Sequence, residues 1–384
     1  MKIVNCSLLQ QCLLWSGVLW LTLLAGFAQC SDNGNIPSSK QQESAKQAGK
    51  PLYFVLLTNN EQSEFWRLTE QAAKKAANDL GIELQVIPLN GNPLRPVRII
   101  SSLVNAPKKP NAVLFSNMKN TGKAVLEILE NHRIHSFIFD NGFAASDQIG
   151  LPGREYRFWQ AELLSDNEVS SRKLTQDLIE AGLSRFTASD PLPMIAMEGN
   201  PSSEVNAERL LGMYDTLKKY KSAVTVKQVF RTRWSTKHAR NAVLATFQRY
   251  PDVKLIWAAS DDMAISAAKT LLEIGKKPGE DVFIAGFDRL PKVLDYIDKG
   301  QIVNSYGGHY MAAAWGVIYM YDFFNGFNLA HRSMQLPMFS HKSTGIPFET
   351  KIRLGNFEEV DFTQFSKTLA PSVQSYPFLT QQSH

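Results

Sequence analysis

Cysteine is scarce in this chain, with three residues in 384, at positions 6, 12 and 30. Cys6 and Cys12 lie in an N-terminal segment typical of a cleaved leader, so that Cys30 alone would remain in the mature chain. A single cysteine forms no internal disulfide, and the fold must therefore be held by its core. The length and the hydrophobic share of 44% are enough for two lobes, each with its own core.

The sequence also lacks the common motifs of enzymes. It contains no glycine-rich phosphate-binding loop and no Gly-x-Ser-x-Gly element. Asp261 and Asp262 are adjacent, and neighbouring side chains point apart on a strand, which argues against an acid–base pair. His132 and His135 have no other metal-ligand residues clustered beside them. We therefore expect no enzymatic activity, no cofactor and no metal site.

A basic stripe is absent as well. The net charge of +5 is modest, and the positive side chains are not clustered along the sequence. A nucleic-acid-binding protein would concentrate them on one face. Ordinary solvated surfaces are the simpler interpretation, so we expect no nucleic-acid partner. We also expect a monomer.

The N-terminus is typical of an exported protein. Residues 1–28 combine one early charge, Lys2, with a hydrophobic run that ends in Gly26-Phe27-Ala28, which fits cleavage after Ala28. An uncleaved membrane anchor is one alternative. A lipoprotein is another because Cys30 ends the run, although Gln29 before it is larger than that processing prefers. Residues 29–50 are polar and predict a disordered tether, and we place the protein in the periplasm.

From residue 51 onward, short apolar runs alternate with helical patterns, which predicts a doubly wound parallel sheet. The expected strands are 52–57, 83–87, 112–115, 136–139, 158–164, 194–197, 224–230, 253–260, 281–287 and 302–306. The expected helices are 65–80, 97–105, 122–131, 167–181, 204–220, 235–250, 263–274, 291–299 and 311–324.

The stretch from Val253 to Gly300 carries the most information. A buried strand ends in Asp261-Asp262, of which one is an N-cap candidate, and a helix stops at Gly275. The next strand ends in Gly286-Phe287-Asp288 before another helix. In open parallel sheets, ligands bind outside the carboxyl ends of the strands, so these polar tips predict a binding site.

This stretch resembles the type I periplasmic sugar-binding proteins, the ribose-, galactose- and arabinose-binding group. The matching segments are Ser260-Asp261-Asp262-Met263-Ala264, Pro278-Gly279-Glu280-Asp281 and Gly286-Phe287-Asp288. The likeness extends over about 51–354. It implies two Rossmann-like doubly wound α/β lobes, joined by a three-segment hinge. Sugar-responsive repressors share the fold, but no helix-turn-helix precedes Pro51.

The resemblance also implies where the chain passes between the lobes, near Gln160, His309 and Phe339. The N-terminal lobe is then 51–160 with 309–338, the C-terminal lobe is 161–308 with 339–365, and a tail follows at 366–384. Gly307-Gly308-His309 stands where the family often has a ligand-contacting glutamine. This departure is more similar to a subgroup that includes autoinducer receptors and sensory binding proteins.

A sugar needs planar polar side chains for its hydroxyls and aromatic faces for its C–H groups. The positions of the strand ends and the family pattern together predict the following ligand contacts: Asn59, Asn60, Phe65, Trp66, Asp140, Asn141, Arg209, Asp261, Phe287, Asp288 and His309. Several have a structural alternative. Asp288 would otherwise cap the helix that begins at Pro291, Arg209 would form an ion pair, and Phe65, Trp66, Phe287 and Trp257 would belong to the core.

These features favour a periplasmic solute-binding protein that closes on a small polar ligand, a sugar or sugar-like signal. It would present the ligand to the permease of an ABC importer. The alternative partner is a membrane sensor kinase or cyclase. An enzyme on the same fold is a further alternative, which turnover of a sugar panel would reveal.

Overall fold

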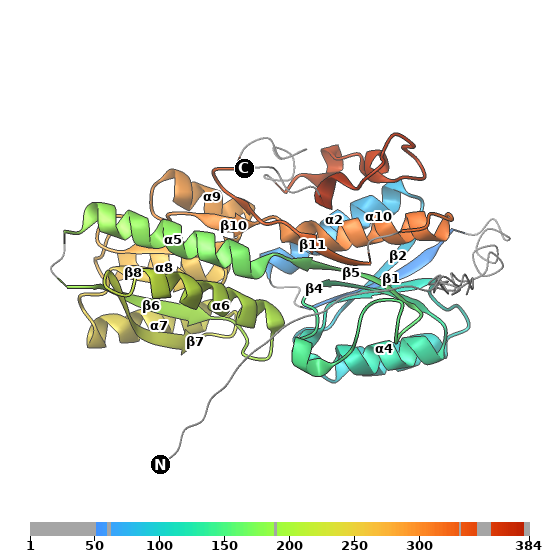
Figure 1. Ribbon diagram of the computed structural model, residues 1–384, viewed down its shortest axis with the longest axis horizontal. Helices are drawn as coiled ribbons and strands as arrows, with labels where there is room; N and C mark the ends of the chain where they lie inside the picture. Colours follow the sequence, from blue (N-terminus) through green and yellow to red (C-terminus); the bar gives the residue numbers. More distant parts are fainter. Residues whose placement is uncertain (1–50, 60–62, 188–189, 330–331, 344–354, 380–384) are drawn as a thin grey trace, which may run out of the picture.

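The computed structural model describes residues 51–59, 63–187, 190–329, 332–343 and 355–379. These residues form two α/β lobes that lie side by side along the long axis of the molecule (Figure 1). The expected leader, the tether, Cys30 and Asn60 lie outside the described residues. No helix in the described ranges has the length and apolar character needed to cross a membrane.

Each lobe is built on a six-stranded sheet. The first has the order β11-β5-β4-β3-β1-β2, and all of its neighbouring strands are parallel. Its strands are β1 (Tyr53–Thr58), β2 (Glu83–Pro88), β3 (Ala112–Phe115), β4 (His135–Asp140), β5 (Trp159–Ser165) and β11 (Ser333–Leu336). The second has the order β12-β10-β9-β8-β6-β7. Its strands are β6 (Leu192–Glu198), β7 (Val224–Arg231), β8 (Leu255–Ala258), β9 (Phe283–Asp288), β10 (Ser305–Gly307) and β12 (Phe339–Ser340), of which only β12 is antiparallel to its neighbour.

Helices cover both faces of the sheets, which explains the continuous apolar strands of the sequence. In the N-terminal lobe, Phe54 and Leu56 of β1 face a core shared with α2 (Glu64–Asp79) and α10 (Ala312–Phe324). Val55 and Leu57 face the opposite core, with α3 (Arg95–Val104) and α4 (Gly122–Asn131).

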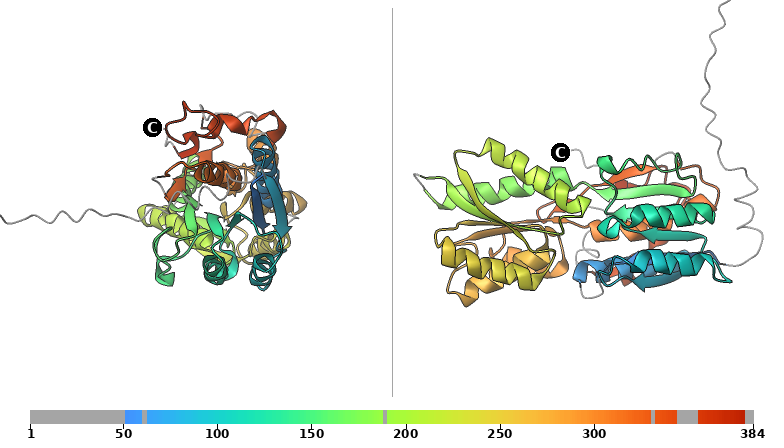
Figure 2. Two further views of the ribbon diagram at one scale, coloured as in Figure 1. Left: turned by 90° about the vertical axis from the view of Figure 1, so that its right-hand side faces the viewer. Right: turned by 90° about the horizontal axis from the view of Figure 1, so that it is seen from below.

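In the C-terminal lobe, α5 (Asn167–Arg185) packs on α6 (Glu204–Lys219), and α7 (Thr236–Arg249) packs on α8 (Asp261–Glu273), on opposite sides of the sheet (Figure 2). The short helix α9 (Pro291–Asp298) follows β9. Single 3-10 turns are η1 (Met118–Asn120), η2 (Ala145–Asp147), η3 (His309–Met311), η4 (Phe357–Glu359), η5 (Phe362–Phe365) and η6 (Pro377–Leu379). The predicted two-lobed doubly wound fold is thus confirmed.

The strand orders place β4 and β9 at equivalent positions, third from one edge of each sheet. The chain leaves the first sheet after Ser165, whereas the sequence predicts the crossing near Gln160; β5 simply continues to Ser165 and pairs with β11. It returns between β10 and α10, at His309, and passes to the second sheet again between Leu336 and Phe339.

Two local predictions differ from the structure. Ser260, rather than Asp261 or Asp262, caps α8, because its hydroxyl accepts the N–H of Met263 and both aspartates lie in the first turn. The helix expected to end at Gly182 continues as α5 to Arg185. Gly182 serves packing instead: a Cβ there would lie 2.6 Å from the side chain of Leu255.

The C-terminal segment packs on the N-terminal lobe, where it covers α2 and α10 (Figure 1). Phe357, Phe362 and Phe365 join the core of that lobe, and Phe378 stacks on Trp315 with ring centroids 4.6 Å apart. The expected assignment of 339–365 to the C-terminal lobe therefore holds only up to β12. The described residues from 357 onward contribute several buried aromatic side chains, and α10 is apolar nearly all round.

One buried carboxylate anchors this segment. Asp322 of α10 accepts hydrogen bonds at Oδ1 from Ser366 Oγ (2.6 Å), Thr368 N (3.0 Å) and Thr368 Oγ1 (2.8 Å). Its Oδ2 accepts from Lys367 N (2.8 Å) and from the Tyr376 hydroxyl (2.9 Å). Five donors around one carboxylate satisfy a charge that would otherwise be costly to bury.

Replacing Asp322 with alanine should therefore release the segment and lower the free energy of unfolding by roughly 2–4 kcal/mol, because five donors lose their acceptor. Urea unfolding measures the loss, and limited proteolysis measures release of the C-terminal residues. Glu358→Ala, an exposed carboxylate on the same segment, is the matched control. Wild-type stability and cleavage rates in Asp322→Ala would show that the aromatic contacts hold the segment without the carboxylate.

Candidate functional site

Two carboxylates approach each other from the two lobes. Asp140 ends β4 and Asp288 ends β9, the equivalent strands of the two sheets. Both have left-handed backbone, with φ of 65° and 103°. Non-glycine residues rarely adopt such angles, although Asp does so more often than most, and strained residues of this kind cluster at functional sites. The carboxyl ends of the two parallel sheets thus meet at a pair of acids.

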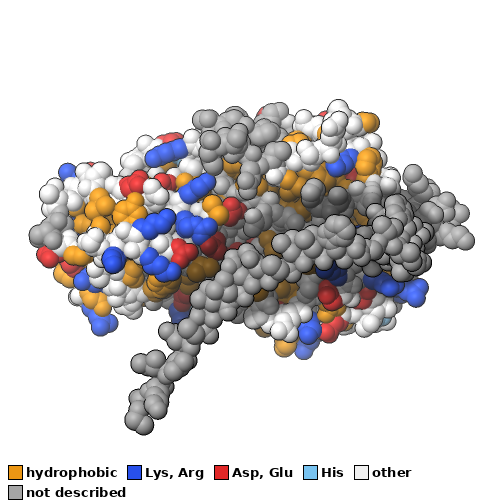
Figure 3. All heavy atoms as spheres, viewed as in Figure 1, with side chains coloured by type: hydrophobic (Ala, Val, Ile, Leu, Met, Phe, Trp, Pro, Cys, Tyr) orange, Lys and Arg blue, Asp and Glu red, His pale blue; other side chains and the backbone are white. Residues whose placement is uncertain are grey.

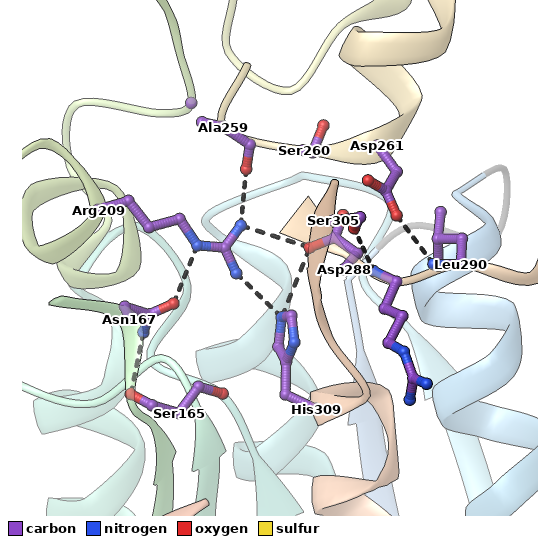
Figure 4. A network of polar contacts seen from close by, with 12 residues as sticks. Ser165, Asn167, Arg209, Ala259, Ser260, Asp261, Asp288, Leu290, Ser305 and His309 are labelled. Carbon is purple, nitrogen blue, oxygen red and sulfur yellow. Dashed lines mark hydrogen bonds and ion pairs between the residues drawn. The ribbon is translucent and has the colours of Figure 1, made fainter. Parts of the chain in front are cut away.

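Arg209 lies at the centre of this site, fully buried on α6 (Figure 4). Its Nε donates to Asn167 Oδ1 (2.9 Å). Its Nη1 donates to the carbonyl of Ala259 (2.6 Å) and lies 3.3 Å from Asp288 Oδ1. Its Nη2 lies 3.0 Å from His309 Nε2. The guanidinium therefore joins the first crossing, the ends of β8 and β9 and the second crossing.

His309 accepts this hydrogen bond as a neutral ring, since a guanidinium only donates. Burial and the positive charge of Arg209 hold the pKa of His309 well below its usual range. Its Nε2 also lies 3.5 Å from Asp288 Oδ1 and 3.9 Å from Asp140 Oδ1. With its lone pair engaged by Arg209, this nitrogen donates to neither carboxylate. The buried Nδ1 has no hydrogen-bond partner among the residues described.

The negative charges of Asp140 and Asp288 receive few hydrogen bonds and little neutralising charge. Burial raises the pKa of Asp140 to about 6, and the charge of Arg209 only partly opposes this shift. Burial raises the pKa of Asp288 to about 7, where Arg209 again opposes the shift while Asp262 and Asp140 add to it. Asp288 receives one donor from Arg209, whereas Asp140 receives no hydrogen bond from the part of the chain that is described.

Asp261 and Gly307 contact the loop that carries Asp288 and hold it in place. Asp261 is fully buried, and its Oδ2 accepts the backbone N–H of Leu290 (2.8 Å). Gly307 of β10 lies directly against the same loop, because a Cβ there would be 2.1 Å from the carbonyl carbon of Asp288. Asp261 therefore supports the loop through Oδ2, and its contact with a ligand stays a prediction.

Aromatic rings lie beside the polar cluster. Phe65 lies 4.8 Å from the ring of His309, and the half-buried Trp66 packs edge-on against Phe65 at 5.4 Å. Phe287 is fully buried beneath the guanidinium of Arg209, 4.6 Å away, so it belongs to the core rather than to a ligand-facing surface. The half-buried Trp234, which the sequence did not nominate, lies 5.8 Å from Arg209.

The lobes also contact each other directly on both sides of the acids. Asn141 Oδ1 accepts from Ser203 Oγ (2.9 Å) and from Val205 N (3.1 Å) at the start of α6. Lys292 of α9 pairs with Glu64 of α2 at 2.8 Å and with Asp262 of α8. The two Asn141 contacts and the Lys292–Glu64 pair join different lobes, so they exist only while the lobes are together.

The structure brings together most of the predicted residues. Asp140, Arg209, Asp288 and His309 form one cluster, with Phe65 beside it. Asn141 lies at the contact between the lobes, and Asn59 follows β1 with a buried Oδ1 that has no partner among the described atoms. Asn167 was missed, although it begins the predicted helix that comes just after a predicted strand. Lys292 had no local signal, because its partners are distant in sequence.

The cluster offers groups that can recognise a polar ligand. The described ranges contain no group of three His, Cys, Asp or Glu side chains that could hold a metal ion. The acids offer acceptor oxygens, the rings offer apolar faces, and Arg209 fixes the geometry. On the face shown in Figure 3, acidic and basic side chains are mixed over the C-terminal lobe.

Comparison with known proteins gives consistent matches. The family model described as periplasmic binding protein domain matches residues 54–325. The galactofuranose-binding protein YtfQ of Escherichia coli is 20% identical over 62% of this chain and 71% of its own. The ribose import binding protein RbsB of Salmonella typhimurium is 22% identical over 65% and 76% of the two chains. The crystal structure of a periplasmic sugar-binding protein from Pseudomonas fluorescens superposes with a TM-score of 0.75 at 22% identity, covering 85% of this chain and 97% of that one.

The raised pKa of Asp140 predicts a pH-dependent stability. A carboxyl whose pKa is raised on folding stabilises the protein fully below its ordinary pKa near 4, and this contribution is lost as the pH rises through about 6. Asp140→Asn should therefore raise the free energy of unfolding at pH 8 by roughly 1–3 kcal/mol and flatten its slope between those values.

Urea unfolding between pH 4 and 8 tests this expectation. Asp252→Asn removes the same charge from an exposed position at the opposite end of β8 and is the control. A variant at position 140 that follows the wild-type slope would show that Asp140 is not the group that titrates.

Proposed function

The chain belongs to the periplasmic binding protein family, and from this premise we propose that it is a periplasmic solute-binding protein that closes on a sugar and presents it to an ABC importer. The carrying observation is the pair Asp140 and Asp288, one from the equivalent strand of each lobe, beside the aromatic ring of Phe65. Relatives named for galactofuranose binding and ribose import support the ligand class and the importer. The family consists of binding proteins, so no catalytic role is proposed.

Closure follows from how the hydrogen-bonding groups are divided. Each lobe presents one of the two carboxylates, so a ligand that bonds both must hold the lobes together. A ligand shifts the equilibrium by its difference in affinity between two states, and here that difference is the set of bonds made by the second lobe. The cross-lobe contacts of Asn141 and Lys292 add to the same state.

Arg209 acts as a positioning residue in this mechanism. Four of its five N–H groups are used by Asn167, Ala259, Asp288 and His309, so it holds Asp288 in place and keeps one N–H on Nη2 for a ligand oxygen. The buried Phe287 and Asp261 support this arrangement from the core side. Asp140, Asp288, Phe65 and Trp66 are the proposed ligand contacts.

Asp288→Ala should abolish sugar binding and leave the fold intact. Losing one buried, charge-assisted partner costs roughly 2–5 kcal/mol of binding free energy. Isothermal titration with a panel of neutral pentoses and hexoses measures the loss, and circular dichroism checks the fold. Asp298→Ala, on the exposed end of α9, is the matched control. An affinity equal to that of the wild type would remove Asp288 from the site.

Gly308 offers a test of closure itself. It has a φ of 94° between β10 and α10, with open space where a Cβ would stand, so that strain alone opposes a side chain. Valine in this backbone region costs about 1–2 kcal/mol, whereas asparagine tolerates it. Gly308→Val should therefore weaken sugar binding about tenfold, and Gly308→Asn should do so much less.

Small-angle scattering completes this test, because the radius of gyration should fall when the sugar binds to the wild type. Tight binding with an unchanged scattering curve would mean a rigid site. Equal affinities for the two Gly308 variants would mean that the bound state does not need this backbone conformation.

A further inference from the structure

The two acids of the site retain several acceptor oxygens, whereas the unused donors of Arg209 and His309 are one N–H on Nη2 and the buried Nδ1. Asp140 has acceptor oxygens and no donor from the described residues, and Asp288 Oδ2 has no hydrogen bond recorded there either. Both oxygens that approach His309 meet a nitrogen whose lone pair is already used by Arg209. A ligand that satisfies these groups must donate hydrogen bonds rather than accept them.

Two buried arginines lie near the acids, Arg209 and Arg289, which follows Asp288 in the chain, and neither forms an ion pair with Asp140. Arg209 is the cation that acts on both Asp140 and Asp288, and its own contacts favour Asp288. The cation of Lys292 is taken up by Glu64 and Asp262 at the contact between the lobes. Asp140 is left without a cationic partner from the described part of the chain, although its side chain is only 11% exposed.

A buried carboxylate of this kind is expensive unless a partner of opposite charge arrives. A hydroxyl group supplies one donor and no charge, whereas an ammonium group supplies three donors and a full positive charge. The ammonium therefore fits the environment of Asp140 better than any neutral group of a sugar.

We propose that the ligand is an amino sugar or aminocyclitol whose positively charged amine pairs with Asp140 while its hydroxyls bond Asp288 and Arg209. This inference rests on the proposed sugar-binding function and narrows it to one ligand class. The ring of Phe65, which packs on His309, lies where it covers an apolar face of the same ligand.

Matched pairs of sugars test the charge. We would titrate the full mature chain at about pH 7 with D-glucosamine and D-glucose, D-galactosamine and D-galactose, and D-mannosamine and D-mannose. The N-acetyl derivatives keep the nitrogen and remove its charge. In at least one pair the amine should bind about tenfold or more tightly than both neutral forms, because a desolvated charge pair is worth at least that much.

Variants assign the preference to a residue. Asp140→Asn should abolish the difference between amine and neutral sugar, Asp140→Glu should keep part of it, and the exposed control Asp252→Asn should leave it unchanged. Thermal melting of each variant verifies that it is folded.

The outcomes separate this inference from the function on which it rests. Neutral sugars that bind as well as, or better than, their amines would overturn the inference and leave the sugar-binding function standing. A preference for the amine that survives in Asp140→Asn would overturn the role of Asp140. Absence of binding throughout the panel would count against both the ligand class and the function.

Discussion

The buried guanidinium of Arg209 is the interaction on which the arrangement of the site depends. It bonds Asn167 where the chain first leaves the N-terminal sheet and His309 where it returns. It also fixes the ends of β8 and β9 through Ala259 and Asp288. A charge buried this deeply is tolerable only when its donors are used, and four neighbours use them. Removing it would leave Asp288 uncompensated and would loosen two crossings at once.

The two lobes support the loops that carry their acids in the same way, with different residues. In each, a polar side chain after the neighbouring strand braces the loop that carries the acid. Asn117, after β3, donates to the carbonyl of Gly142 (2.8 Å) beyond Asp140. Asp261, after β8, accepts from Leu290 N beyond Asp288. Equivalent positions in the strand orders thus support the two loops, although the amide of Asn117 donates and the carboxylate of Asp261 accepts.

Much of this was accessible from the sequence, because the strands are buried on both faces and their apolar runs are hard to mistake. The strand predicted at 112–115 matches β3, and those predicted at 136–139 and 281–287 lie within two residues of β4 and β9. The polar residues that end these last two strands led to Asp140 and Asp288. Side chains that meet across the lobes were not accessible. Lys292 and Glu64 are far apart in the chain, and neither sits in a local pattern that distinguishes it from an exposed helix residue. The sequence predicted 366–384 as a tail, whereas the burial of its described aromatic residues depends on the apolar surface that α10 offers.

The opposing forces between the lobes give the proposed closure its direction. Asp140 and Asp288 carry like charges toward each other when both are ionised, and Asp140 raises the pKa of Asp288 for that reason. This repulsion disfavours the joined lobes, while Lys292 and Asn141 favour them. Without a ligand, the repulsion between the acids opposes the cross-lobe contacts, so neither one alone determines whether the lobes are closed. A ligand with several hydrogen-bond donors turns the repulsion between the two carboxylates into attraction, because both then bind a common partner. Closure would thus depend on the ligand that lies between the acids. The contacts of Lys292 and Asn141 would only set how tightly that ligand must bind.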